Sequence, residues 1–205
     1  MKKLLLSAFV ICLAGTSIAQ ESPLWMRHCA LSPDGTTIAF TYKGDIYTVP
    51  STGGRATQIT TNPAFDTEPV WSPDSKQIAF ASDRMGSLDV FVVSSEGGAP
   101  QRLTTHSGSE KPVAYKDNKH ILFTANIAPS AEDAGFPSGQ FQQVYEVAVT
   151  GGRPAMFSSM PMECISINKE GVMLYQDKKG YEDYWRKHQV SPIARDIWTY
   201  TPGKK

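Results

Sequence analysis

The chain has 205 residues, of which 40% are hydrophobic and 20% are charged. Its 20 basic and 20 acidic side chains balance, and without Lys2 and Lys3 the balance becomes 18 to 20, a net charge of −2. This near-neutral charge gives no electrostatic basis for binding nucleic acid or an anionic membrane, so we predict neither as a partner.

Residues 1–19 have the pattern of a secretory signal peptide. Two lysines open the segment, residues 4–13 are apolar, and residues 17–19 supply the small-residue pattern that a signal peptidase cleaves. The apolar run is shorter than the roughly 20 residues that a membrane span needs. A buried N-terminal helix and a lipid anchor on Cys12 fit the pattern less well. We expect cleavage before Gln20, secretion across the inner membrane to the periplasm, and no membrane insertion afterwards.

The rest of the chain repeats one unit four times. A Ser-Pro-Asp-Gly motif at residues 32–35 recurs as Ser-Pro-Asp-Ser at 72–75 and, in degenerate form, at 115–118 and 168–171, with spacings of 40, 43 and 53 residues. Two short apolar or aromatic triplets follow each motif, and a Gly pair closes the first three units. The triplets begin at Ile38, Ile78, Ile121 and Met173, and then at Asp45, Asp89, Gln143 and Asp196.

Each unit has the chemistry of a four-stranded antiparallel meander. Ser-Pro-Asp-Gly favours a type I turn, because Pro fixes φ and the Ser and Asp oxygens bond nearby amides. The triplets are rich in β-branched and aromatic residues, which is typical of strands, and the Gly pair suits a tight hairpin. Four-stranded units of about 40 to 45 residues are typical of propeller blades.

We therefore predict an all-β fold over residues 20–205, a β-propeller with about four four-stranded antiparallel blades. The blades are expected near residues 25–66, 67–110, 111–162 and 163–205. Propellers usually close a ring of four to eight blades, whereas the fourth unit here is unfinished, so the predicted ring is incomplete. We expect a fragment or a truncated product that is poorly soluble or associates through its two open blade faces.

Cys29 and Cys164 remain once the leader is removed, and each lies just before a turn motif, in the first and fourth units. An oxidising compartment would permit a disulfide. Blades so far apart, however, would face each other across a propeller. Because a free cysteine commonly packs as a small hydrophobic residue, the sequence favours two buried thiols.

The second unit carries the residues of a recognisable repeat. Trp71-Ser72-Pro73-Asp74, then Ile-Ala-Phe-Ala-Ser-Asp-Arg at 78–84, then Asp-Val-Phe-Val at 89–92, resembles the repeat of TolB-type propellers. Tricorn proteases and dipeptidyl-peptidase-type enzymes share this repeat. The order of Trp25, the first blade and Gly-Asp-Ile-Tyr at 44–47 is similar to that of bacterial tricorn-like proteases. The stretch at 175–198 is similar to the same group.

This resemblance covers nearly the whole mature chain and implies an N-terminal propeller that is not itself catalytic. Such a propeller gates or binds peptide substrates for a C-terminal serine peptidase region, which is missing from this chain. Two alternatives remain open: a stand-alone TolB-like periplasmic scaffold that binds proteins, and the propeller of a dipeptidyl-peptidase-type α/β-hydrolase. The three differ in the region C-terminal to the propeller, and the stretch at 175–198 favours the first.

No catalytic motif is visible in the mature chain, which lacks a Gly-x-Ser-x-Gly elbow, His-Glu-x-x-His, a Walker-type loop and a metal-spaced Cys/His cluster. We therefore predict no catalytic residue, no cofactor and no metal ligand. We expect His106 to cap a loop, His120 to be exposed, and Asp45 with its equivalents to bond a neighbouring turn. The remaining acidic positions of the repeat fall in turns, which indicates repeat geometry rather than acid–base chemistry: Asp34, Asp74, Asp117 and Glu170.

Two insertions depart from the repeat, at residues 127–142 and 181–194. Long insertions between propeller strands tend to lie on one face of the disc, where partners bind. The second insertion contains Tyr184, Trp185 and Arg186, which are residue types enriched at binding hot spots. These three are the candidate partner-binding residues, although the same aromatic residues would equally serve to hold the loop against its own blade.

Overall fold

The computed structural model describes residues 25–127, 142–160, 162–168, 170–177 and 197–201. The predicted signal peptide, most of residues 127–142 and all of residues 181–194 lie outside this part of the chain. No helix among the described residues is long and apolar enough to cross a membrane.

The described chain forms four antiparallel sheets, and the strands of each sheet follow one another in sequence order. The first sheet contains β1 (Arg27–Leu31), β2 (Thr37–Tyr42), β3 (Asp45–Pro50) and β4 (Thr57–Gln58). The second contains β5 (Asp66–Trp71), β6 (Gln77–Ser82), β7 (Asp89–Ser94) and β8 (Gln101–Arg102). The third contains β9 (Lys111–Asp117), β10 (His120–Ala125), β11 (Gln143–Ala148) and β12 (Ala155–Ser158). The fourth contains β13 (Met162–Ile167), β14 (Met173–Asp177) and β15 (Ile197–Tyr200).

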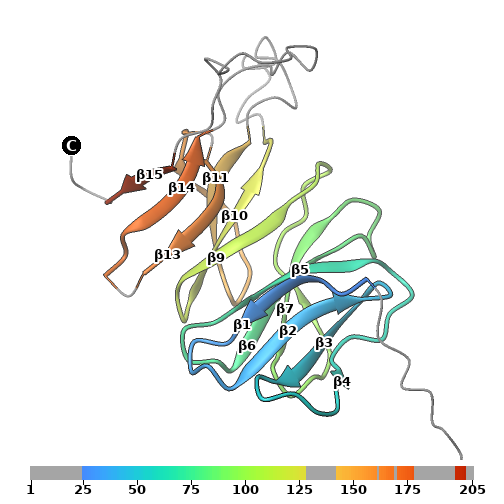
Figure 1. Ribbon diagram of the computed structural model, residues 1–205. Coiled ribbons are helices and arrows are strands. Elements are labelled where there is room, and N and C mark those ends of the chain that lie inside the picture. The colour runs from blue at the N-terminus through green and yellow to red at the C-terminus, as the bar shows by residue number, and fades with distance from the viewer. Residues whose placement is uncertain (1–24, 128–141, 161, 169, 178–196, 202–205) are drawn as a thin grey trace, which may run out of the picture.

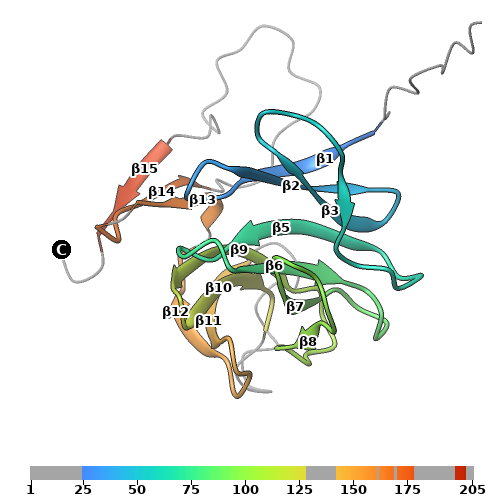
Figure 2. The ribbon, with the colours of Figure 1, turned by 90° about the horizontal axis from the view of Figure 1, so that it is seen from below.

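These sheets are the blades of a β-propeller, as the repeat predicted. They fan out around a common centre, with β1, β5, β9 and β13 innermost and the later strands of each sheet further out (Figures 1 and 2). Three blades have four strands, and the fourth has three among the described residues. The all-β fold class and the blade architecture are therefore confirmed.

The Ser-Pro-Asp turns connect the first strand to the second in the first and second blades. Ser32 Oγ donates to Asp34 Oδ1 at 2.6 Å, and the Thr36 N–H donates to the same oxygen at 2.9 Å. These hydrogen bonds, led by that from Ser32, lower the pKa of Asp34 to about 2. The second blade repeats the pattern, because Ser72 Oγ donates to Asp74 Oδ1 at 2.6 Å and lowers the pKa of that carboxyl. The turn carboxylates thus serve the repeat geometry.

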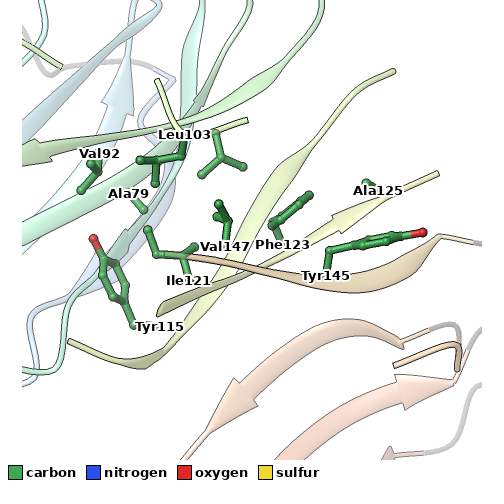
Figure 3. Packing of buried hydrophobic residues seen from close by; sticks show 10 residues of the cluster. Ala79, Val92, Leu103, Tyr115, Ile121, Phe123, Ala125, Tyr145 and Val147 are labelled. Atoms are coloured by element: carbon green, nitrogen blue, oxygen red, sulfur yellow. The ribbon is translucent and has the colours of Figure 1, made fainter. Parts of the chain in front are cut away.

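Each blade packs its face against the next blade through a separate apolar cluster. Between the second and third blades, Ala79, Val92 and Leu103 meet Ile121 and Phe123 (Figure 3). Comparable clusters join the first blade to the second and the third to the fourth. Cross-strand aromatic pairs stiffen the first three blades, with ring centroids 5.8 to 5.9 Å apart: Phe40–Tyr47, Phe80–Phe91 and Phe123–Tyr145.

Candidate functional site: the cavity between the innermost strands

The innermost strand of every blade carries a bulge, and the bulges of β1, β5 and β13 lie at the same place. In these three strands the register shifts so that two residues face one residue of the neighbouring strand. In β9 the register shifts at two places, between the partners of His120 and Ile121 and between those of Leu122 and Phe123. His28, Glu68 and Cys164 open three of these bulges, with φ of 51°, 54° and 52°. Because a bulge bends its strand and changes the direction of its side chains, these residues turn away from the flat faces of the blades.

The four bulges surround one cavity of about 670 Å³, which lies at the centre of the fan and receives side chains from all four blades. A volume of this size falls in the range of ligand sites, roughly 300 to 1,000 Å³. Most of the wall is apolar. The lining residues are His28, Cys29, Ala30, Glu68, Pro69, Val70, Lys111, Pro112, Val113, Thr124, Gln142, Met162, Glu163, Cys164 and Ile165.

One ion pair crosses the wall between the second and third blades. Lys111 Nζ lies 2.7 Å from Glu68 Oε1, and both side chains are partly exposed. An exposed pair of this kind contributes little stability, at most about 1 kcal/mol. It does cancel the charge of both side chains at the cavity wall. The cavity therefore combines apolar surface with a few polar groups.

The prediction that Cys29 and Cys164 are buried is wrong. Both are free thiols with exposed side chains, and both line the central cavity. The reason is their place in the fold, since each lies within the bulge of an innermost strand. Side chains at a bulge need not enter the apolar layer between two blades.

The other local expectations can be compared with the described residues. His106 does cap its loop, since its Nδ1 accepts a hydrogen bond from the Gly108 N–H at 3.0 Å. His120 is only partly exposed, and its Nδ1 lies 3.0 Å from Asp117 Oδ2. Asp45 accepts hydrogen bonds from Thr60 Oγ1 and Gln58 Nε2, at 3.3 and 3.0 Å, so it does hold the neighbouring strand and turn.

Within the described ranges, no group of three or more His, Cys, Asp or Glu side chains could hold a metal ion. The candidate partner-binding residues Tyr184, Trp185 and Arg186 lie outside the described residues.

The cavity has no signature in residue type along the sequence. The lining positions have no shared residue type: the residues that open the bulges of β1, β5 and β13 are His28, Glu68 and Cys164. What these positions share is a fixed distance before the turn motif, four residues ahead of Ser32, Ser72 and Asn168. That spacing is the signal that could have located the cavity wall.

Four-stranded blades with Ser-Pro-Asp turns, arranged around a central cavity, define a propeller of the kind seen in TolB and tricorn proteins. Residues 23–205 match the family described as the tricorn protease N-terminal β-propeller domain. The chain belongs to this family, as its resemblance implied.

Individual relatives agree. A stretch of 77 residues, 38% of this chain and 7% of the relative, is 39% identical to tricorn protease homolog 1 of Streptomyces coelicolor. A stretch of 108 residues, 47% of this chain and 16% of the relative, is 32% identical to the uncharacterized peptidase YuxL of Bacillus subtilis. These matches therefore span only a small part of each relative.

Solved structures show the same fold. TolB from Agrobacterium tumefaciens aligns with 75% of this chain and 57% of its own, with a TM-score of 0.56 and 25% identity. The tricorn protease crystal structure aligns with 85% of this chain and 21% of its own, with a TM-score of 0.59. At 14% identity the latter likeness is one of fold alone.

Proposed function

We propose that this chain is the exported, non-catalytic propeller part of a tricorn-like serine peptidase, and that peptide substrates bind in or pass through its central cavity. The carrying observation is that a chain of the tricorn propeller family arranges the innermost strands of four blades around one largely apolar cavity. Peptides suit this cavity because an extended segment offers apolar side chains to the walls and backbone groups to the polar positions.

The export part of the proposal rests on residues 1–19. Their positive start, short apolar run and small-residue end are the three features of a cleavable leader. The test is N-terminal sequencing of the protein recovered from the periplasm of an expressing bacterium, which should begin at Gln20. Recovery of the uncut chain in the cytoplasm would refute export.

The cavity is tested through its two thiols. A fluorescein-labelled, uncharged ten-residue peptide of Ala, Leu and Val is titrated in a Cys12→Ser background, and binding is followed by anisotropy. Alkylating Cys29 and Cys164 with a bulky maleimide should weaken binding at least about tenfold by filling the cavity. The matched control is the Cys29→Ser/Cys164→Ser variant, whose affinity for the peptide should be unchanged by treatment with the maleimide. Unchanged affinity after complete alkylation would place peptide binding elsewhere.

The insertion at residues 181–194 is a separate candidate binding site, and the same assay tests it. We propose that Tyr184, Trp185 and Arg186 contact the peptide or protein partner, because these residue types dominate binding hot spots. The triple alanine variant should then lose affinity while its circular dichroism stays that of a folded β-protein. An unaltered dissociation constant for this variant would count against a role of the insertion in binding.

A TolB-like scaffold that binds protein partners is the second candidate, and the 25% identity to Agrobacterium TolB across 75% of the chain favours it. The two candidates differ in the domains encoded beside the propeller. Genomic DNA flanking the coding sequence should encode a PDZ-like module and a serine peptidase core if the first is right. A hydrolase domain with a Gly-x-Ser-x-Gly elbow would instead indicate a dipeptidyl-peptidase-type enzyme, and the absence of both would leave the scaffold.

A further inference from the structure

The junctions between blades contain a recurring polar position. At two places the first residue of a blade's third strand lies near a carboxyl group at the start of the next blade. Asp45 lies near Asp66, and Asp89 lies near Glu110, the residue before β9. Equivalent backbone hydrogen bonds form at both junctions. The Asp66 N–H donates to Gly44 O, and the Glu110 N–H donates to Leu88 O, each at 2.7 Å. Two carboxyl groups therefore meet at each of the first two junctions.

The first junction neutralises its buried carboxylate. Asp66 has no exposed surface, and Arg84 Nη2 lies 2.9 Å from both of its carboxylate oxygens. Arg84 Nε donates to Ser82 Oγ at 2.8 Å, which fixes the guanidinium in place. Asp66 is thus fully paired although it lies inside the protein.

The second junction has lost that guanidinium. Aligning β10 with β6 through their pairing registers places Ala125 where the second blade has Ser82, and Ile127 where it has Arg84. Glu110 has no exposed surface, and neither of its carboxyl oxygens has a partner with hydrogen-bond geometry among the described residues. A buried carboxylate left without a partner is costly, and the usual response is to take up a proton.

The groups that face Glu110 come from the second blade. Asp89 on β7 has no exposed surface, and neither of its carboxyl oxygens has a partner with hydrogen-bond geometry among the described residues. Arg102 Nη2 on β8 lies 2.8 Å from Asp89 Oδ2, and Thr104 lies beside Glu110. Two carboxyl groups thus share one guanidinium, so one added proton makes the cluster neutral.

Other charged or titratable groups near this junction are engaged elsewhere. Lys111 on β9 pairs with Glu68 at the central cavity, and His106 in the loop after β8 caps Gly108. On β10, Ala125, the residue after the Thr124–Lys111 pair, carries no charge. The carboxyl pair with Arg102 therefore behaves as one unit.

We infer that Asp89 and Glu110 share a single proton across the joint between the second and third blades, and that loss of this proton loosens the joint. The inference concerns the propeller itself and stands whether or not peptides bind in the cavity. Protonation supplies the hydrogen-bond donor that two facing carboxylates lack, so a proton on Glu110 can be donated to Asp89 across the joint. Deprotonation leaves two buried like charges on opposite sides of the joint, served by one guanidinium. The apolar packing shown in Figure 3 then opposes this repulsion.

The pH window is set by the Glu110 carboxyl. Burial, followed by the neighbouring Asp89, raises its pKa from 4.5 to about 7, although the nearby Thr104 hydroxyl acts in the opposite direction. A carboxyl whose pKa is higher in the closed state binds protons more tightly there, so closing is favoured at low pH. The stabilisation is complete below the ordinary pKa of Glu and is lost as the pH rises through about 7.

Amide hydrogen exchange measured by NMR on the full chain tests the inference. The reporters are the Leu103 N–H, which donates to Val90 O at 2.8 Å, and the Glu110 N–H. After correction for the intrinsic exchange rate, their protection should fall about tenfold between pH 6 and pH 8, as linkage requires for a pKa near 7. Amides of β13 and β14 in the fourth blade are the internal control, because Gln143 and Met162 replace the carboxyl pair at the third junction.

Variants separate the proton from other causes. Glu110→Gln should make the protection of both reporters independent of pH over this range. The double variant Ala125→Ser/Ile127→Arg, which restores the partner found in the second blade, should do the same by keeping Glu110 ionised and paired. Glu68→Gln and His106→Gln should leave the pH dependence intact, which excludes the cavity ion pair and the imidazole. An equal fall in Glu110→Gln, or at all three junctions in the native chain, would overturn the inference.

Discussion

Arg84 shows how a single side chain decides whether a charge can be buried. Its guanidinium lies 4.5 Å from the centre of the Phe91 ring and 5.6 Å from that of Phe80, so it is enclosed by aromatic faces as well as paired with Asp66. Arg84 therefore stacks on aromatic rings, donates hydrogen bonds and neutralises Asp66 at the same time. The flexible ammonium group of a lysine does this less well.

Replacing Arg84 by Met is therefore expected to be severe. The change keeps an apolar side chain of similar length but leaves the Asp66 carboxylate buried and alone, so the free energy of unfolding should drop by about 3–5 kcal/mol. Urea denaturation followed by tryptophan fluorescence measures it. The double variant Arg84→Met/Asp66→Asn should recover part of the loss. Equal stability of the single variant and the native chain would show that this pair does not hold the junction.

At the scale of the strand and turn, the sequence predicted most of what is observed. The turn at Ser72 and the strand at Ile78 depend on residues within a few positions of each other, so local chemistry decides them. The bulges depend instead on how two strands align, and residues as different as Glu68 and Cys164 adopt them. That is why the cavity, and the exposure of both thiols, could not be deduced from local pattern.

The cross-strand aromatic pairs join neighbouring strands within a blade, and Phe123 is a fully buried example. Phe123→Ala should lower the free energy of unfolding by about 3–5 kcal/mol, because it removes a large side chain and leaves a cavity against Tyr145. Thermal and urea unfolding measure the change. Met85→Ala, at a position 61% exposed, is the control and should change stability by less than about 0.5 kcal/mol. A small effect of Phe123→Ala would mean that the third blade repacks.

At the scale of the whole molecule, the repeat predicted the blades but not the chemistry between them. Arg84 and Asp66 belong to one blade, yet their pairing relieves a carboxyl cluster that also includes Asp45 of the blade before. Such contacts join residues from separate repeat units, and no spacing rule within one unit encodes them. The same holds for Glu110, whose environment differs from that of Asp66 because Ala125 and Ile127 stand where the second blade has Ser82 and Arg84.

The outer face of the fourth blade exposes large apolar side chains. Leu174 and Ile197 are 48% and 78% exposed, whereas Leu122 and Val144, at the equivalent positions of the third blade, have no exposed surface. In the first three blades this face packs against the facing side of the next blade, which in the second blade is the side that carries Trp71. The first blade presents its own such face, with Leu31 at the Trp71 position and 59% exposed.

We therefore expect copies of this chain to associate head to tail, the fourth blade of one against the first blade of another. Sedimentation velocity should show a weight-average mass that rises with concentration. Leu174→Thr/Ile197→Thr should weaken association at least about tenfold, because each apolar side chain contributes roughly 1.5–3 kcal/mol when buried. At a concentration where both proteins are monomeric, the same variant should unfold at the native urea midpoint, since neither side chain is in a blade junction. Leu122→Ala provides the contrast: it should lower stability by about 2–5 kcal/mol and leave the concentration dependence of the folded protein unchanged. A native chain that stays monomeric at every concentration would mean that this face is not an association surface.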